Sequence, residues 1–285
     1  MEGKIIFISG STDGIGKQAA LELAKQGAHI IVHGRNKEKT KAAVEFIKTE
    51  SKSENIDYVL ADMSSFKQIR AMSEILHERY DRIDVLVNNA GAQIHEFQHS
   101  EDGYELNFAV NHLGYVLTTS LLLDLVAKSE YKRIVIVSSG MHFRLEEIDY
   151  EVFKGKASYD LYNYYAHSKL ANILFGYKLS RLLKESGITV NSLHPGLINT
   201  NLNPQRPQHI VARALPVESG IISTMHLVTS SELDRVTGKY FTSDGTETES
   251  SPISYHIADQ EKLWTISETC VGMNLMKYHE SEGLE

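Results

Sequence analysis

Short runs of apolar and β-branched residues alternate along the chain with longer segments in which apolar residues recur at helical spacing. The runs lie at residues 4–9, 29–33, 57–61, 83–88, 133–138, 189–194 and 239–242. Asn36 and the pair Ser65 and Gln68 are typical of helix starts between them. The pattern predicts an α/β protein in which a parallel sheet of about seven strands is covered by helices on both faces. We expect one doubly wound domain over residues 1–285.

Composition limits the classes of protein that this sequence can encode. The 285 residues include 37 acidic and 29 basic side chains, a net charge of −8, which gives no basic surface for nucleic acid. The single cysteine, Cys270, excludes an internal disulfide and fits a reducing compartment. No apolar run is expected to reach the roughly 18 residues of a membrane span, and a strand starting near Lys4 leaves no room for a signal peptide. We expect a cytoplasmic protein without a transmembrane segment or a nucleic-acid partner.

The first predicted strand is followed by a glycine-rich turn that opens a helix. In doubly wound sheets, ligands bind beyond the carboxyl ends of the strands. Glycines there let the backbone approach a pyrophosphate, whose charge is favoured by the free N–H groups of the helix start. A simple glycine-rich turn is the alternative, but the flanking strand and helix favour a dinucleotide site of the Rossmann type. The predicted contacts are Gly10, Ser11, Thr12, Asp13, Gly14, Ile15 and Gly16.

The residues after the second and third strands bear on the choice of dinucleotide. Arg35 and Asn36 stand where an acidic residue would bind a ribose hydroxyl, whereas an arginine suits a 2′-phosphate. We therefore expect NADP(H) as the preferred cofactor, with NAD(H) as the alternative. A solvated helix start is the other interpretation of Arg35. Asp62 and Met63 are expected to meet the adenine, although an N-cap or Asx turn is nearly as good an explanation for Asp62.

Small and polar residues follow the later strands at the same predicted edge. Amide and small residues after the fourth strand are suited to packing against a flat cofactor while tying neighbouring strands together, and a plain turn is the alternative. The fifth strand ends in Ser138 and Ser139, and the sixth leads into a proline-glycine turn. The further predicted cofactor contacts are Asn89, Ala90, Gly91, Pro195, Gly196, Ile198 and Thr200.

Tyr165 and Lys169 lie four residues apart within an apolar-periodic segment, one helical turn from each other on the same face. An ammonium beside a phenol favours the phenolate, and lowering the phenol pKa from about 10 towards 7 takes roughly 4 kcal/mol. Such a tyrosine is suited to moving a proton to or from an alcohol oxygen at neutral pH. A tyrosine and a lysine at this spacing are a weak signal alone, and a solvated helix face is the alternative for the lysine.

Together these motifs resemble the short-chain dehydrogenase/reductase family over essentially the whole chain. The family's TGxxxGxG pattern matches residues 9–16, with Ser9 in place of threonine, and NNAG matches residues 88–91. A strand-end serine, the YxxxK pair and a Pro-Gly turn follow in the family order. Finer details resemble the retinol-dehydrogenase-like branch, which includes the oxidoreductase domain of WW-domain proteins. They are Asp102-Gly103-Tyr104-Glu105, Asn111-His112-Leu113-Gly114, residues 165–172, residues 238–241 and Ser251-Pro252.

The resemblance implies a catalytic tetrad of Asn111, Ser139, Tyr165 and Lys169, and hydride transfer between NADP(H) and a carbonyl or alcohol. Tyr165 would be the general acid or base and Ser139 would hold the substrate oxygen. Lys169 would lower the pKa of Tyr165 and hold the nicotinamide ribose, and Asn111 would anchor a water relay. Two of these residues also have structural alternatives: Ser139 could cap the turn after its strand, and Asn111 could bond a backbone carbonyl. A non-catalytic NADP(H)-binding regulatory module is the alternative function.

The resemblance also bears on the substrate and the assembly. Residues 197–216 resemble a substrate lid, with a variable surface loop as the alternative, and residues 257–278 form a predicted helical tail. The insert at residues 140–164 is expected to reshape the substrate pocket. Because the chain shows no apolar N-terminal anchor, a membrane retinoid is not implied, and we expect a small or medium apolar carbonyl as substrate. Family habit implies a homodimer or homotetramer.

The sequence His95-Glu96-Phe97-Gln98-His99 spells HExxH, a pattern of zinc proteases. Zinc binding by this pattern needs a helix, a third ligand and a cleft. Here the pattern directly follows NNAG and precedes a predicted helix start, so we expect a loop over the cofactor and no metal site.

Overall fold

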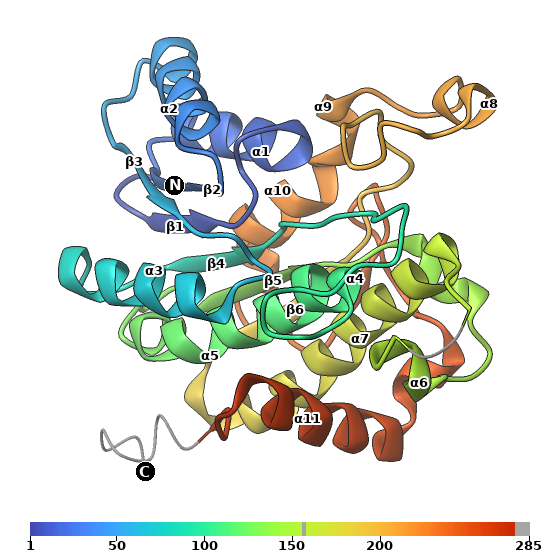
Figure 1. Ribbon diagram of the computed structural model, residues 1–285. Coiled ribbons are helices and arrows are strands. Elements are labelled where there is room, and N and C mark those ends of the chain that lie inside the picture. The colour runs from blue at the N-terminus through green and yellow to red at the C-terminus, as the bar shows by residue number, and fades with distance from the viewer. Residues whose placement is uncertain (156–157, 277–285) are drawn as a thin grey trace.

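The computed structural model describes residues 1–155 and 158–276. Figure 1 shows one twisted sheet with helices packed on both of its faces. The strands run in the order β3-β2-β1-β4-β5-β6-β7-β8; β1 to β7 are parallel, and β8 is antiparallel to β7. Their bounds are β1 Ile5–Ile8, β2 His29–Gly34, β3 Ile56–Leu60, β4 Val85–Asn88, β5 Arg133–Val137, β6 Thr189–Leu193, β7 Tyr240–Phe241 and β8 Glu247–Thr248.

The predicted α/β, doubly wound Rossmann architecture is confirmed. All seven predicted strands are present, within a few residues of their expected bounds. β8 was not predicted; its two residues are both exposed and pair with β7 at the edge of the sheet. A two-residue exposed strand has no apolar alternation, so the hydrophobic pattern did not reveal it.

Helices cover both faces of the sheet because alternate strand residues point to opposite sides. In β1, Ile6 and Ile8 join one core with α1, α2 and α10, whereas Phe7 joins the other core with α3, α5, α7 and α11. The helix bounds are α1 Gly14–Lys25, α2 Lys37–Ser51, α3 Phe66–Arg79, α4 Leu106–Phe108, α5 Gly114–Ala127, α6 Tyr150–Phe153, α7 Leu161–Leu182, α8 Gln208–Val211, α9 Val217–Gly220, α10 Ile222–Thr229 and α11 Ile257–Val271. A π-helical turn, Ala109–Leu113, joins α4 to α5, and 3₁₀ turns span Gly140–Arg144, Lys184–Ser186, Ser231–Leu233 and Pro252–Tyr255.

The joined helix Leu106–Ala127 is long and apolar enough to cross a membrane, with a mean hydropathy of 1.3. By length and composition, the expectation that no run has membrane length is therefore wrong. Within the protein, 94% of this window is buried. The helix is apolar on nearly all sides because it lies between the sheet and outer elements.

The predicted C-terminal helix is present as α11, which packs against α7. Leu263 and Trp264 are buried at this contact, and Trp264 stacks on Phe175 of α7 with 5.7 Å between ring centroids. The last two residues of the predicted tail, 277 and 278, lie outside the described residues.

Candidate active site

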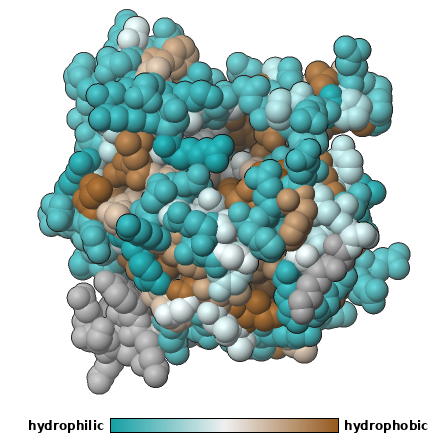
Figure 2. Space-filling view, viewed as in Figure 1, coloured by the Kyte–Doolittle hydropathy of each residue, from teal (hydrophilic) through white to brown (hydrophobic). Residues whose placement is uncertain are grey.

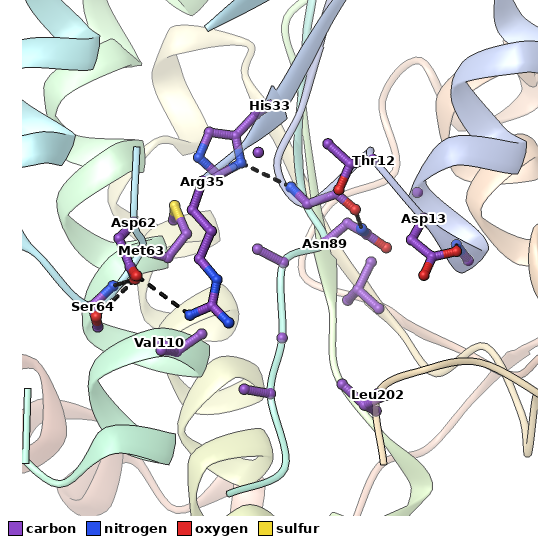
Figure 3. A pocket seen from close by; sticks show the side chains of 18 of the residues that line it. Thr12, Asp13, His33, Arg35, Asp62, Met63, Ser64, Asn89, Val110 and Leu202 are labelled. Atoms are coloured by element: carbon purple, nitrogen blue, oxygen red, sulfur yellow. Dashed lines mark hydrogen bonds and ion pairs between the residues drawn. The ribbon is translucent and has the colours of Figure 1, made fainter. Parts of the chain in front are cut away.

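A cavity of about 580 Å³ follows the carboxyl ends of the first strands. Most of the predicted cofactor contacts line it: Gly10, Thr12, Asp13, Gly14, Ile15, Gly16, Arg35, Asp62, Met63, Asn89, Ala90, Gly91, Tyr165, Lys169, Pro195 and Thr200. The segments that carry them come from five different strand ends, as Figure 3 shows for the labelled residues around Arg35 and Asn89. Figure 2 shows hydrophobic residues at several places on the face seen in Figure 1, separated by hydrophilic residues.

The glycines of the turn after β1 are required by close backbone packing. Gly10 has a φ of +65°, and a Cβ built on it would lie 2.7 Å from the Cα of Ala90. A Cβ on Gly16 would lie 2.4 Å from the carbonyl oxygen of Gly10. The missing side chains at Gly10 and Gly16 let the turn pack closely beside the cavity, next to the start of α1, an arrangement that suits a pyrophosphate.

We expect Gly10→Ala to lower the free energy of unfolding by about 2 to 3 kcal/mol, because the alanine adds both left-handed strain and a clash with Ala90. Gly187→Ala is the matched control, since Gly187 has a φ of +74° and a Cβ there would meet nothing within 4 Å. That change should cost only about 1 kcal/mol. Urea unfolding of both variants gives the comparison, and equal losses would show that backbone conformation alone requires Gly10.

Ser11 does not face the cavity but holds the turn from inside. Its buried hydroxyl donates to the carbonyl of Ile8 (2.7 Å) and accepts the N–H of His33 (2.9 Å). The sequence reading overlooked His33, which lines the cavity and whose Nδ1 accepts the N–H of Gly10 (2.9 Å; Figure 3). Burial lowers the pKa of His33 to about 4, so a neutral imidazole fixes the turn. The only feature of the sequence that could have indicated His33 is its position at the end of a strand. That position does not reveal its contact with Gly10, which follows another strand.

Arg35 stands at the end of β2 with a largely exposed guanidinium, whose Nη1 lies 3.4 Å from Oδ2 of Asp62. Burial disfavours ionisation of Asp62, but hydrogen bonds from Ser64 and the charge of Arg35 outweigh it and lower its pKa. Ser64 donates to Asp62 from both N–H and hydroxyl, which is the Asx turn considered as the alternative. Asn36 caps α2 by accepting the N–H of Lys39 (2.9 Å) and does not line the cavity.

Amide side chains tie together the loop after β4. Asn89 donates to the carbonyls of Ser9 (2.9 Å) and Gly10 (3.1 Å), which links this loop to the turn after β1. Asn111, in the π-helical turn, accepts the N–H of Ala92 (2.7 Å) and donates to its carbonyl (2.9 Å). The side chain of Asn111 thus holds the loop backbone and sits beside the YxxxK helix, where it also donates to Ser168 (3.0 Å).

A second cavity of about 410 Å³ adjoins the first. Tyr165, Pro195 and Thr200 line both, whereas Gly196 and Ile198, two of the predicted cofactor contacts, line only the second. Segment 197–216, the predicted lid, supplies much of its wall. The phenol of Tyr165 therefore lies where a dinucleotide-sized cleft meets a smaller chamber.

The two serines after β5 have different partners. Ser138 donates its hydroxyl to the backbone carbonyl of Lys169 (2.7 Å), which fixes α7 against the strand. Ser139 hydrogen-bonds the side chain of Tyr165, as does Gln93, a residue that the sequence reading did not select. Ser139 also caps the following 3₁₀ turn by accepting the N–H of Met141 (3.2 Å), so its predicted capping role is real as well.

The charge relation between Tyr165 and Lys169 differs from the expectation. Burial raises the pKa of Tyr165, and the hydrogen bonds from Ser139 and Gln93 and the charge of Arg206 only partly offset it. Burial also lowers the pKa of Lys169 to about 7. Its amine donates to the carbonyl of Val137 (3.1 Å) and lies 5.8 Å from the centroid of the Tyr165 ring. Desolvation is thus the largest influence on the pKa of both groups, and it acts on the phenol in the direction opposite to the expected effect of the lysine.

The HExxH segment is a loop, as expected. His95 hydrogen-bonds Asn203 through Nε2 (2.7 Å), which connects this loop to the segment 197–216. Within residues 1–155 and 158–276, no group of three or more His, Cys, Asp or Glu side chains is arranged to hold a metal ion.

Comparison with known proteins places these features in a family. The family model for short chain dehydrogenases matches residues 4–210. Mouse retinol dehydrogenase 14 is 36% identical over 96% of this chain and 87% of its own length. Human polyprenol dehydrogenase is 32% identical over 95% of this chain and 86% of its own length.

Solved structures share the fold. A protein from Mycobacterium paratuberculosis superposes with a TM-score of 0.80 at 25% identity, covering 96% of this chain and 95% of its own. A short chain dehydrogenase from Shigella flexneri, complexed with NADP, has a TM-score of 0.70 at 22% identity, covering 85% of this chain and 98% of its own.

The expectation of a cytoplasmic location is wrong. It conflicts with the similarity to retinol dehydrogenases and polyprenol dehydrogenase, which are typically proteins of membranes or the endoplasmic reticulum. Cysteine count and net charge report on redox chemistry and surface solvation. Neither determines where a folded protein resides, which is why the composition misled.

The order of motifs had suggested this relationship, and the fold and relatives bear it out. The chain belongs to the short-chain dehydrogenase family, in its retinol-dehydrogenase-like branch.

Proposed function

We propose that this protein transfers a hydride between NADP(H) and a carbonyl or alcohol substrate. One observation carries the proposal: the hydroxyl-bearing side chain of Tyr165 lines both cavities and hydrogen-bonds Ser139. The 580 Å³ cavity, with its bare glycine turn and the start of α1, fits a dinucleotide. The 410 Å³ cavity is then the substrate chamber, and segment 197–216 is its lid.

Tyr165, Ser139 and Asn111 have different roles in the proposed reaction. The bound nicotinamide supplies or accepts the hydride. Tyr165 donates a proton to the carbonyl oxygen during reduction and removes it during alcohol oxidation. Ser139 donates a hydrogen bond to the same oxygen as charge develops on it, an interaction of a kind that contributes about 3 kcal/mol in oxyanion sites. Asn111 holds the loop after β4 in place beside Lys169.

Lys169 has a pKa suited to sharing a proton near neutral pH. Its amine is buried, and burial lowers its pKa to about 7. We propose that it holds the nicotinamide ribose and that its charge favours the phenolate of Tyr165 once the dinucleotide is in place. Asn111 would anchor the water relay that returns protons to it.

We propose NADP(H) as the preferred cofactor. The exposed guanidinium of Arg35 lies at the cavity wall, where a 2′-phosphate would find a planar donor. Asp62, the acidic residue nearest to it, is already engaged by Arg35 and Ser64. Solved relatives of the same fold are complexed with NADP or NADPH.

Arg35→Leu should lower kcat/KM for NADPH by about 10- to 100-fold, the range expected for losing a hydrogen bond to a charged group. Activity with NADH should change less than threefold. Lys41→Leu, an exposed change farther along α2, is the control and should alter neither value. Parallel losses with both cofactors would contradict the phosphate role.

Turnover of NADPH and NADH against a panel of aldehydes and ketones tests the reaction itself. Oxidation of NADPH that depends on the carbonyl, with the alcohol as product, is the expected result. Tight NADPH binding together with no turnover of any carbonyl would instead favour a non-catalytic NADP(H)-binding module.

A further inference from the structure

The wall of the 410 Å³ cavity is electrostatically one-sided. Among the described residues that line it, no Asp or Glu is present, whereas Arg144, Arg206 and His209 are. The remainder of the wall is apolar or neutral, with Met141 and Ile210 as examples. In a chain with a net charge of −8, such a chamber is the reverse of the average surface.

Neither arginine of the chamber is neutralised by a carboxylate within residues 1–155 and 158–276. The other arginines of this part of the chain that form ion pairs are Arg35, Arg82, Arg133 and Arg181. Arg206 instead donates from Nη1 to the backbone carbonyl of Ile198 (2.9 Å). This bond orients the guanidinium and leaves its remaining N–H groups for another acceptor.

The chamber's positive charge acts on the reacting group. Arg206 is half-buried, and its charge lowers the pKa of Tyr165, although burial has the larger and opposite effect. Arg144 follows the same strand end as Ser139, in the 3₁₀ turn that Ser139 caps. Both arginines therefore belong to the space that contains the phenol of Tyr165.

From this arrangement we propose that the substrate is an anion: a carbonyl compound or alcohol that carries a carboxylate or phosphate, bound by Arg206 and Arg144. This inference rests on the proposed function and names its substrate class. A guanidinium presents parallel N–H donors that match these anionic groups, and a concave wall whose charged side chains are all basic favours an anion. The expected small apolar carbonyl offers neither arginine an anionic partner, and the neutral retinol and polyprenol named for the relatives offer none either.

Matched substrates separate charge from shape. We would measure kcat/KM with NADPH for 4-carboxybenzaldehyde, its uncharged methyl ester and 4-formylphenyl phosphate. Wild-type protein should prefer at least one anion to the ester by about tenfold or more, and the two anions distinguish a carboxylate from a phosphate. Equal rates for all three aldehydes would overturn the proposal while leaving the reductase function intact.

Substitutions then test whether Arg206 and Arg144 produce the preference for an anionic aldehyde. Arg206→Met and Arg144→Met keep an apolar stem, and each should lower kcat/KM for the preferred anion by about 10- to 100-fold. The loss for the ester should be clearly smaller, so that the ratio of anion to ester falls in both variants. Arg213→Met is the control, because Arg213 is exposed on segment 197–216 and does not line the cavity. A preference that survives both Arg206→Met and Arg144→Met would also overturn the proposal.

A binding measurement is independent of turnover. Isothermal titration of the NADP⁺-saturated protein with benzoate, phenyl phosphate and benzamide should show tighter binding of at least one of the two anions, lost in Arg206→Met and kept in Arg213→Met. If no aldehyde is reduced, the proposed function fails and this titration alone decides the anion site. Equal affinity for both anions and the amide would then refute the anion site as well.

Discussion

Tyr165→Phe should lower kcat by about 10³- to 10⁴-fold, near the upper range of contributions from a positioned general acid. The change removes only the hydroxyl that Ser139 and Gln93 hold at the junction of the two cavities. The dissociation constant for NADPH should change less than threefold, because the cleft wall keeps its shape. Steady-state rates and fluorescence titration of NADPH measure the two quantities separately.

Tyr162→Phe is the matched control for this experiment. Tyr162 lines the same substrate chamber and is 38% exposed, so the variant removes a phenol hydroxyl from the same wall. It should retain activity within about threefold, the scatter expected for a surface hydroxyl. A Tyr165→Phe enzyme with more than a tenth of the wild-type kcat would remove Tyr165 from the chemistry.

Lys169→Met should make the ligand-free protein more stable at low pH. Burial lowers the pKa of Lys169 from 10.5 to about 7, so the unfolded chain binds more protons than the folded one between these values. The stability of the wild type therefore rises with pH across that window, with a slope of up to about 1.4 kcal/mol per pH unit, and the penalty is complete below pH 7. At pH 6 the variant should exceed the wild type by about 2 to 4 kcal/mol, after the lost hydrogen bond to Val137 is subtracted.

Urea unfolding at pH 6, 7.5 and 9.5 without nucleotide tests this, with the difference between the proteins shrinking as pH rises. Lys184→Met, at an exposed position beyond the end of α7, controls for the loss of a lysine as such. The catalytic activity of Lys169→Met should be lower than that of the wild type, because the same buried amine is proposed to act on Tyr165. A difference between wild type and Lys169→Met that does not vary with pH would show that the amine is not held in a desolvated state.

The regular part of the fold was accessible from local patterns. Strands β1, β2, β4, β5 and β6 are almost entirely buried runs four to six residues long, and a buried strand leaves a clear apolar signature. The edge of the sheet was harder: β8 is two exposed residues whose pairing with β7 is set by the turn between them. Location was misjudged for a different reason, since composition carries little information about where a protein resides.

The candidate site divides in the same way. Motif residues such as Gly10, Tyr165 and Lys169 were selected because their spacing implies a shared surface. His33, Gln93 and Arg206 were missed because each acts through a contact between segments distant in sequence. Asn36 and Ser11 were placed near the cofactor, yet their side chains cap a helix and brace a turn, a difference that depends on which way a side chain points.

The sequence by itself determined that a parallel sheet forms and that the polar side chains of the site lie at its carboxyl edge. Both follow from periodicity and from the order of elements, which are local properties of the chain. Only the tertiary structure decided how far the side chains of the site are shielded from water. Desolvation depends on everything packed around a group, so it raises the pKa of Tyr165 and lowers that of Lys169 when spacing alone had predicted the opposite for the phenol. Likewise, only the folded chain shows that Arg144 and Arg206 line the same cavity as Tyr165, with no Asp or Glu among the described residues of its wall.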